Sequence, residues 1–190
     1  MRAGVNPEKE LKRLFQQAEQ CALTSMKEEG RLQPLLLVAT PSGELRYTAP
    51  ILDDRKDMFV NTCRMICAAS QATAVVLATE AWLKMAEPGD ESGSKMPPSE
   101  CSDRIEVVIL MGEAVGVKSR QKWMPIVRSD RGDFFGFGES DGPKEVTFEG
   151  RFSQFLPPKP PSAADRTLTT AVLAAMGISL DGLRPGPDRN

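Results

Sequence analysis

Histidine is missing altogether from the 190 residues of this chain. Imidazole is the side chain best suited to accept and donate protons near neutral pH, so its absence excludes Ser-His-Asp and Cys-His nucleophile systems. It also excludes hydrolases and deaminases whose zinc is held by histidine. Any catalysis by this chain would therefore depend on carboxylate, lysine, tyrosine or cysteine side chains.

An excess of charge of one sign is lacking as well, because 24 Lys and Arg face 26 Asp and Glu, for a net charge of −2. A field this small does not by itself recruit nucleic acid or an anionic membrane. The apolar runs are far shorter than the ~20 residues that cross a bilayer. No apolar signal segment follows the first arginine. The expectation is a cytoplasmic protein with no membrane partner.

Cysteine is limited to Cys21, Cys63, Cys67 and Cys101, and no CxxC pair is present to suggest a zinc site. Cys63 and Cys67 are four residues apart on one helix face, a spacing that does not satisfy disulfide geometry. Buried free thiols in a reducing compartment are therefore the prediction.

Two apolar runs, at 73–85 and 104–113, dominate the middle of the chain. Both have period-two rows rich in β-branched residues, which is typical of strands. Both are apolar on the two faces at their middle, as in strands that are covered on each side. A loop rich in Gly, Ser, Pro and charge separates them at 87–103. The two runs are predicted to pair as an antiparallel hairpin at the centre of a sheet.

The flanking segments predict helices and short strands joined by turns. Helical spacing with capping residues at the ends is typical of three segments, which are 6–29, 53–71 and a short helix opened by Ser162 and ended by Gly177. Strands are expected in a tight hairpin at 35–39 and 45–48, at 134–138 and at 146–152. A further short strand is expected at 123–128, at an edge or a bulge because of Pro125, after a polar turn at 116–122.

This order predicts an α+β fold with one antiparallel sheet of about five to seven strands and helices mainly on one face. The element order, α-β-β-α-β-β-β(-β)-α, resembles that of the roadblock, longin and profilin-like proteins, a likeness that carries no functional motif. We expect a single domain at 1–156, a proline-rich connector at 157–161, and a C-terminal helix with a frayed tail at 162–190.

The acidic residues of the central hairpin are the candidate catalytic or metal site. The register of the two runs is left open by the sequence; a pairing that puts Glu80 and Glu106 on one face would place them near Arg104, with Asp103 just before it. Such a cluster would hold a hard divalent metal such as Mg²⁺ or Mn²⁺ through oxygen, or serve as an acid–base pair. Catalytic candidates are thus Glu80 and Glu106, and metal candidates are Glu80, Asp103 and Glu106. A structural Glu–Arg pair at a sheet end is the favoured interpretation, because ion-pair networks commonly imitate sites.

Three residues are candidates for binding a partner: Trp82, Arg104 and Trp123. In addition, Lys118, Arg120 and Lys122 alternate beside Trp123, a pattern that resembles a small nucleic-acid contact. Three positive charges on a turn are more often simply solvated.

The central hairpin also resembles a family of uncharacterised bacterial and phage-borne proteins. The likeness rests on Glu80-Ala81-Trp82, followed by Pro98-Ser99-Glu100, Asp103-Arg104 and Glu106-Val107, and covers roughly residues 73–128. It implies a bacterial, cytosolic or prophage-associated origin. It implies no activity, ligand or catalytic residue.

Together these observations favour a non-catalytic, cytosolic binding or assembly module that forms a homo-oligomer or binds an unidentified protein, with no cofactor. The alternatives are a histidine-free carboxylate enzyme that uses Glu80 and Glu106 with a hard divalent metal, and a weak nucleic-acid binder that uses Lys118, Arg120 and Lys122.

Overall fold

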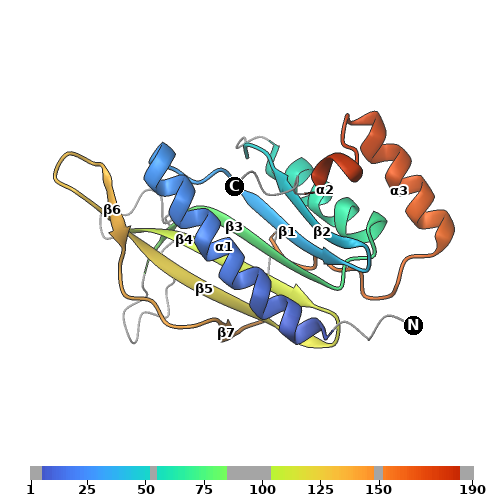
Figure 1. The fold of residues 1–190 in the computed structure, drawn as a ribbon, viewed down its shortest axis with the longest axis horizontal. Helices are drawn as coiled ribbons and strands as arrows, with labels where there is room; N and C mark the ends of the chain where they lie inside the picture. Colours follow the sequence, from blue (N-terminus) through green and yellow to red (C-terminus); the bar gives the residue numbers. More distant parts are fainter. Residues whose placement is uncertain (1–5, 52–54, 85–103, 148–151, 185–190) are drawn as a thin grey trace.

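A seven-stranded antiparallel sheet forms the middle layer of the computed structural model, which describes residues 6–51, 55–84, 104–147 and 152–184 (Figure 1). The strand order is β2-β1-β3-β4-β5-β6, and β7 pairs with the outer side of β5. The α+β class and the antiparallel sheet are confirmed. The elements are α1 (Pro7–Glu29), β1 (Leu35–Thr40), β2 (Gly43–Thr48), α2 (Lys56–Ala69), β3 (Ala74–Leu83), β4 (Ile105–Ala114), β5 (Val117–Arg128), β6 (Phe134–Phe137), β7 (Lys144–Glu145), α3 (Ala163–Ala175) and a 3₁₀ turn, η3 (Asp181–Leu183).

Helix α1 begins and ends where its capping residues predict. The side chain of Asn6 accepts hydrogen bonds from the backbone N–H groups of Glu8 and Lys9, at 3.0 and 3.3 Å. Pro7 occupies the first turn, and Gly30 closes the helix in the left-handed region at φ 68°. The helix is amphipathic, and no helix within the described ranges has the length and apolar character that crossing a bilayer requires.

Within the described residues, α1 is the helix that covers one face of the sheet. The helix buries an apolar stripe that includes Leu11 and Phe15 against the even-numbered side chains of β3 and β4, among them Val76 and Leu110. Gly112 lies directly under this stripe. A Cβ atom at Gly112 would stand 2.5 Å from Cε2 of Phe15 and 2.9 Å from Cδ1 of Leu11, so glycine is what permits the close approach of helix and sheet.

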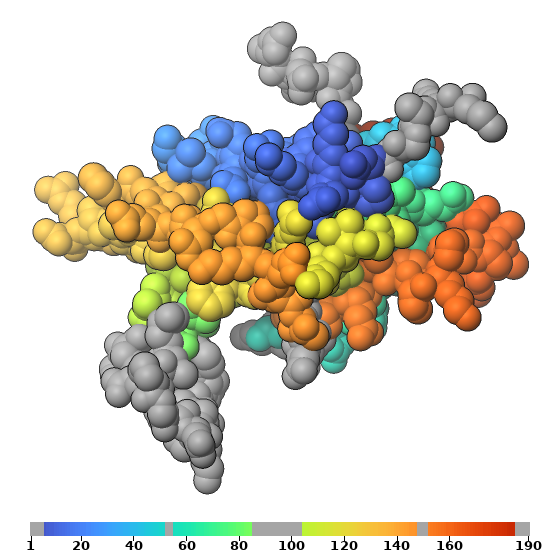
Figure 2. Space-filling view, turned by 90° about the horizontal axis from the view of Figure 1, so that it is seen from below, coloured from blue at the N-terminus to red at the C-terminus, as the bar shows by residue number. Residues whose placement is uncertain are grey.

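The opposite face is covered by α2 and, behind it, by α3. Helix α2 buries Phe59, Cys63 and Cys67 against Val75 and Leu77, while Met58, in its first turn, is 52 % exposed. Helix α3 opens with the predicted capping box of Ser162 and Asp165 and packs beside α2, where Leu173 is fully buried. Among the described helices, α2 and α3 thus pack together, while α1 lies on the other face, where its blue atoms are seen above the sheet in Figure 2.

Strands β3 and β4 pair as the two apolar runs predict. Their antiparallel register joins Ala74 to Ala114 at one end and Leu83 to Ile105 at the other. They are the two middle strands of the path, flanked by β1 and β5. The predicted loop at 87–103, together with Asp53, Asp54 and the end of the tail, lies outside the described residues.

The prediction for residues 116–128 was wrong in two respects. The turn is confined to Val115 and Gly116, which has φ 72°, and residues 117–128 form one long strand that lies inside the sheet. Charged residues alternate along its first half and so imitate a polar turn. Pro125 fits this inner strand because its carbonyl accepts from Gly138 on the outer side, at 2.8 Å. The nitrogen of Pro125 faces the same side, away from β4. The missing N–H of proline therefore removes no hydrogen bond from the β4–β5 ladder.

The strand predicted at 146–152 was also wrong for the residues that are described. Only Lys144 and Glu145 form a strand, and residues 146, 147 and 152 do not. The chain then passes to the face that α2 covers, where Phe155 is 1 % exposed and Glu113 accepts a hydrogen bond from Leu156 N at 3.1 Å. Phe152, Phe155 and Leu156 enter that core from a segment that is not a strand.

Candidate functional site

Glu80 and Glu106 lie on the same face of the sheet, the face that α1 covers. The register pairs Trp82 with Glu106 and Glu80 with Val108. Side chains that oppose each other across a strand pair share a face, so the two acids are diagonal neighbours on adjacent strands. The register, which the sequence left open, thus puts both carboxylates on one face, at the end of the sheet where α1 stops.

Arg128, at the end of β5, holds Glu106 with a bidentate ion pair. Its Nε and Nη2 atoms donate to the two carboxylate oxygens of Glu106, each at 2.7 Å. The Nη1 atom donates to the carbonyl oxygens of Gly30 and Gly132, both at 3.3 Å. The hydrogen bond to Glu106 raises the pKa of Arg128, and the charge of Glu80 adds to that effect. The guanidinium therefore stays charged and ties β4 and β5 to the end of α1.

Glu80 performs a related task on the neighbouring strand. One of its carboxylate oxygens accepts the backbone N–H of Leu32, in the connection between α1 and β1. Together with the contact of Arg128 to Gly30, this bond fixes that connection to the sheet. A backbone amide held by a carboxylate is a charge-assisted hydrogen bond, stronger than a neutral one.

The cluster is thus organised as an ion-pair network, which supports the favoured interpretation of a structural Glu–Arg pair. Both oxygens of Glu106 are engaged by Arg128. Over the described ranges, no three potential metal-ligating side chains come together, and Asp103 lies outside them. Arg128 was not singled out from the sequence. One indication of its role is present in the sequence: Arg128 is the first charged residue after Lys122 and follows five uncharged residues.

Trp82 and Arg104 lie beside this network. The guanidinium carbon of Arg104 is 4.3 Å from the ring centroid of Trp82, the distance of a cation–π contact. Trp82 is 42 % exposed. The two predicted binding residues are thus in contact with each other, on the α1 face.

The basic row on β5 does not present three free cations. Lys118 pairs with Glu145 of β7 at 2.8 Å, and Arg120 pairs with Glu8 of α1 at 2.7 Å. Lys122 pairs with Glu19 of α1 at 2.8 Å. A phosphate backbone would have to displace a carboxylate at each position, so the geometry does not support these residues as a nucleic-acid contact.

Trp123 lies on the other face of the sheet from Trp82. It pairs with Ile109, whose side chain packs toward the core beneath α2. Helices α2 and α3 stop short of this part of the sheet, which is the end remote from them in Figure 1. Four large apolar side chains remain exposed here, and we call them the apolar end: Ile105 (41 %), Trp123 (40 %), Val127 (40 %) and Phe135 (81 %).

Phe135 owes its exposure to a β-bulge. Val127 pairs with Gly136 while Arg128 pairs with Phe134, so β6 has one extra residue at this point. Phe134 and Phe137 pack toward the α1 core, and the residue between them is turned outward. The sequence held one indication of this exposure. A four-residue strand at a sheet edge cannot bury three phenylalanines on one face, so at least one of them is expected to face solvent.

A shallow groove of about 470 Å³ runs across β4 and β5 within the apolar end. Its floor is formed by Leu83, Ile105, Val107, Trp123 and Pro125. Its rim carries Glu139, Asp141 and Lys144, of which Asp141 and Lys144 pair with each other. An apolar floor with a charged rim is suited to an apolar side chain supplied by a partner.

The buried thiols of Cys63 and Cys67 are neither accessible to solvent nor ionised at neutral pH, so they are not reactive. Cys63 and Cys67 are free, and neither exposes surface. Burial raises the pKa of the Cys63 thiol to about 12 and that of Cys67 well above its ordinary value. At pH 8 a thiol with such a pKa is ionised in only about one molecule in ten thousand, and the thiolate is the reactive form.

We expect Cys63 and Cys67 to resist a thiol-specific reagent at pH 8 until the chain is unfolded. In a Cys101→Ser background, the native protein should react at Cys21, which is partly exposed, and the other two thiols only in denaturant. Mass spectrometry of the labelled peptides measures this directly. Labelling of Cys67 at the rate of Cys21 in the native state would show that Cys67 is not buried between α2 and the sheet.

Comparison with protein-family models, with curated proteins and with solved structures found no match to this chain. The likenesses to the roadblock group and to the uncharacterised bacterial and phage-borne family therefore stay predictions from the sequence.

Proposed function

We propose that the chain is a non-catalytic binding and assembly module that self-associates through its apolar end. The observation that carries this proposal is that Ile105, Trp123, Val127 and Phe135 are all at least 40 % exposed at one end of the sheet. Single exposed apolar residues are common on protein surfaces, but a group at one place marks an interaction site. Tryptophan and phenylalanine are also the side chains enriched in protein–protein contacts.

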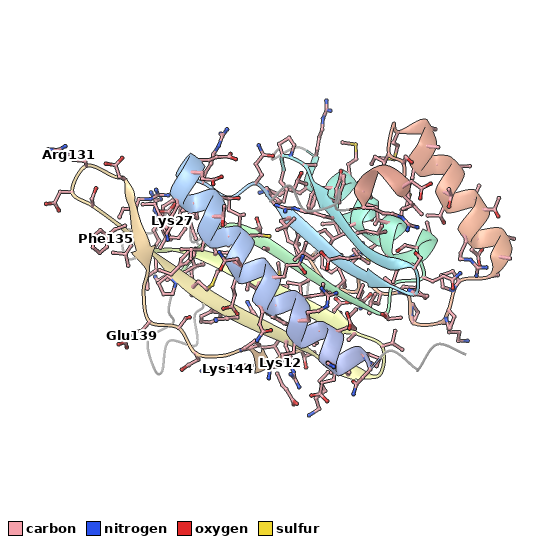
Figure 3. All side chains as sticks on the ribbon, in the orientation of Figure 1. Lys12, Lys27, Arg131, Phe135, Glu139 and Lys144 are labelled. Atoms are coloured by element: carbon pink, nitrogen blue, oxygen red, sulfur yellow. The ribbon has the colours of Figure 1, made fainter. Side chains whose placement is uncertain are left out.

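The position of the apolar end supports a protein as its occupant. The terminal strand β6 has the sequence Phe-Phe-Gly-Phe, without the lysine or proline that commonly guards a sheet edge. In Figure 3, Phe135 lies at the left-hand end of the molecule, well away from α3. A second copy reaches this end without disturbing either helix layer.

Phe135→Lys is expected to weaken self-association at least about thirtyfold, the cost of removing an aromatic hot spot of about 2 kcal/mol. The variant should keep its melting temperature, because the side chain that is changed is 81 % exposed. Sedimentation equilibrium over a range of concentrations gives the dissociation constant of wild type and variant.

Val115→Lys is the matched control, because Val115 is 57 % exposed in the turn before β5, at the end of that strand remote from β6. It should leave the dissociation constant unchanged. A wild-type chain that stays monomeric up to about 1 mM, where even weak specific contacts form, would refute self-association.

A further inference from the structure

We infer that the groove of the apolar end is filled by Phe135 of a second copy of this chain. Each copy then supplies one knob, which is Phe135, and one hole, which is the groove. This inference rests on the proposed function, because it says how the copies meet. Phe135 does not line the groove of its own chain, and it is the most exposed large apolar side chain in the described residues, at 81 %.

The hole fits the knob in chemistry and in size. Leu83, Ile105, Val107 and Pro125 provide an aliphatic floor, and Trp123 provides an aromatic wall. A groove of about 470 Å³ accommodates a phenyl ring together with part of the strand that carries it. Aromatic pairs are stabilised beyond the area they bury, which favours a phenylalanine next to Trp123.

The placement of knob and hole on neighbouring strands of one copy suits a closed dimer. Trp123 and Phe135 belong to β5 and β6, and the register puts Phe135 opposite Val127 and Arg128, about 15 Å from Trp123 along the strand at ~3.3 Å per residue. A two-fold axis that passes between them brings each Phe135 to the other copy's groove at the same time. Such an isologous contact uses up both knobs and both holes, so assembly stops at two copies.

Charge adds a second point of complementarity. Arg131, in the turn before β6, and Glu139, on the rim of the groove, have no ion pair within the described part of the chain, and both are exposed (Figure 3). The same docking brings the turn of one copy toward the rim of the other. Asp130 and Asp133 lie in the same turn, so the turn as a whole is not positively charged and a change at Arg131 alone would be a weak test. The test therefore places opposite charges at Phe135 and in the groove.

The test uses two full-length variants that fail alone and succeed together. Phe135→Lys removes the knob and leaves the hole, while Ile105→Glu places an acid in the hole and leaves the knob. Each variant alone should be monomeric where the wild type is dimeric. A mixture should form a heterodimer, because the intact knob enters the intact hole and the lysine meets the glutamate. Sedimentation velocity with one variant fluorescently labelled detects this species, and the melting temperature of each variant confirms folding.

The outcomes separate this inference from the proposed function. Monomeric single variants with a heterodimer in the mixture support the inference. A mixture that stays monomeric overturns the knob-and-hole pairing while self-association through the apolar end stands. A single variant that still dimerises like the wild type also overturns the inference. Wild-type species that grow beyond two copies overturn the two-fold arrangement, and a wild-type chain that is always monomeric overturns the proposed function itself.

Discussion

Gly112→Ala is expected to lower the free energy of unfolding by about 2 kcal/mol, within the usual cost of overpacking a core. The added Cβ would stand 2.5 Å from the ring of Phe15 and 2.9 Å from Leu11, and both side chains are at most 2 % exposed. Neither has free space to enter, so α1 must move away from β4. For a chain of this length, the melting temperature should fall by about 4–8 °C.

A double-mutant cycle shows whether the clash is the cause. Phe15→Leu shortens the side chain that meets the new methyl, so the pair Gly112→Ala and Phe15→Leu should cost less than the sum of the single changes. Gly136→Ala is the control, because nothing lies within 4 Å of a Cβ at Gly136. Equal losses at the two glycines would mean that α1 does not pack over Gly112.

Arg128→Met is expected to cost about 2 kcal/mol, less than the 3–5 kcal/mol typical of fully buried pairs. The side chains of Arg128 and Glu106 are 29 % and 20 % exposed, so water offsets part of the loss. Without the guanidinium, Glu106 loses both of its hydrogen bonds from Arg128, Glu80 loses a favourable charge, and the Gly30 carbonyl loses a donor. Chemical denaturation gives the change in free energy.

Adding Glu106→Gln to Arg128→Met should recover part of this loss, because the unpaired carboxylate is then gone. Lys12→Met is the control, since Lys12 is an exposed lysine of α1 with no ion pair in the described part of the chain (Figure 3). If Arg128→Met proved as harmless as the control, the bidentate pair would not be what holds this end of the sheet.

The same pair bears on the alternative of a carboxylate enzyme. A metal ion bound to Glu106 would have to compete with both hydrogen bonds from Arg128. Glu80 would also have to release the amide of Leu32. The geometry therefore favours a structural role for this cluster, and it is why the proposed function rests on the apolar end instead.

Local signals in the sequence predicted most of the fold. Asn6 with Pro7, Gly30, and the box of Ser162 with Asp165 mark helix ends whose hydrogen bonds are made by near neighbours. The pairing of the two apolar runs was also predictable, because strands that are apolar on both faces belong at the centre of a sheet.

Where prediction failed, contacts between distant residues had decided the structure. The first half of β5 looks like a turn because it alternates with Lys118, Arg120 and Lys122. These three basic residues fit a strand because each forms an ion pair with a carboxylate of α1 or β7. No reading of residues 116–122 alone contains that information.

The amino-acid sequence by itself determined the class of fold, the central hairpin and the exclusion of histidine chemistry. These follow from composition and from period, which are properties of the chain read in order. Only the tertiary structure decided that Arg128 is the partner of Glu106, that Trp82 and Trp123 lie on opposite faces, and that α2 and α3 leave one end of the sheet uncovered. Those outcomes depend on strand register and helix placement, which are set by residues far apart in the sequence.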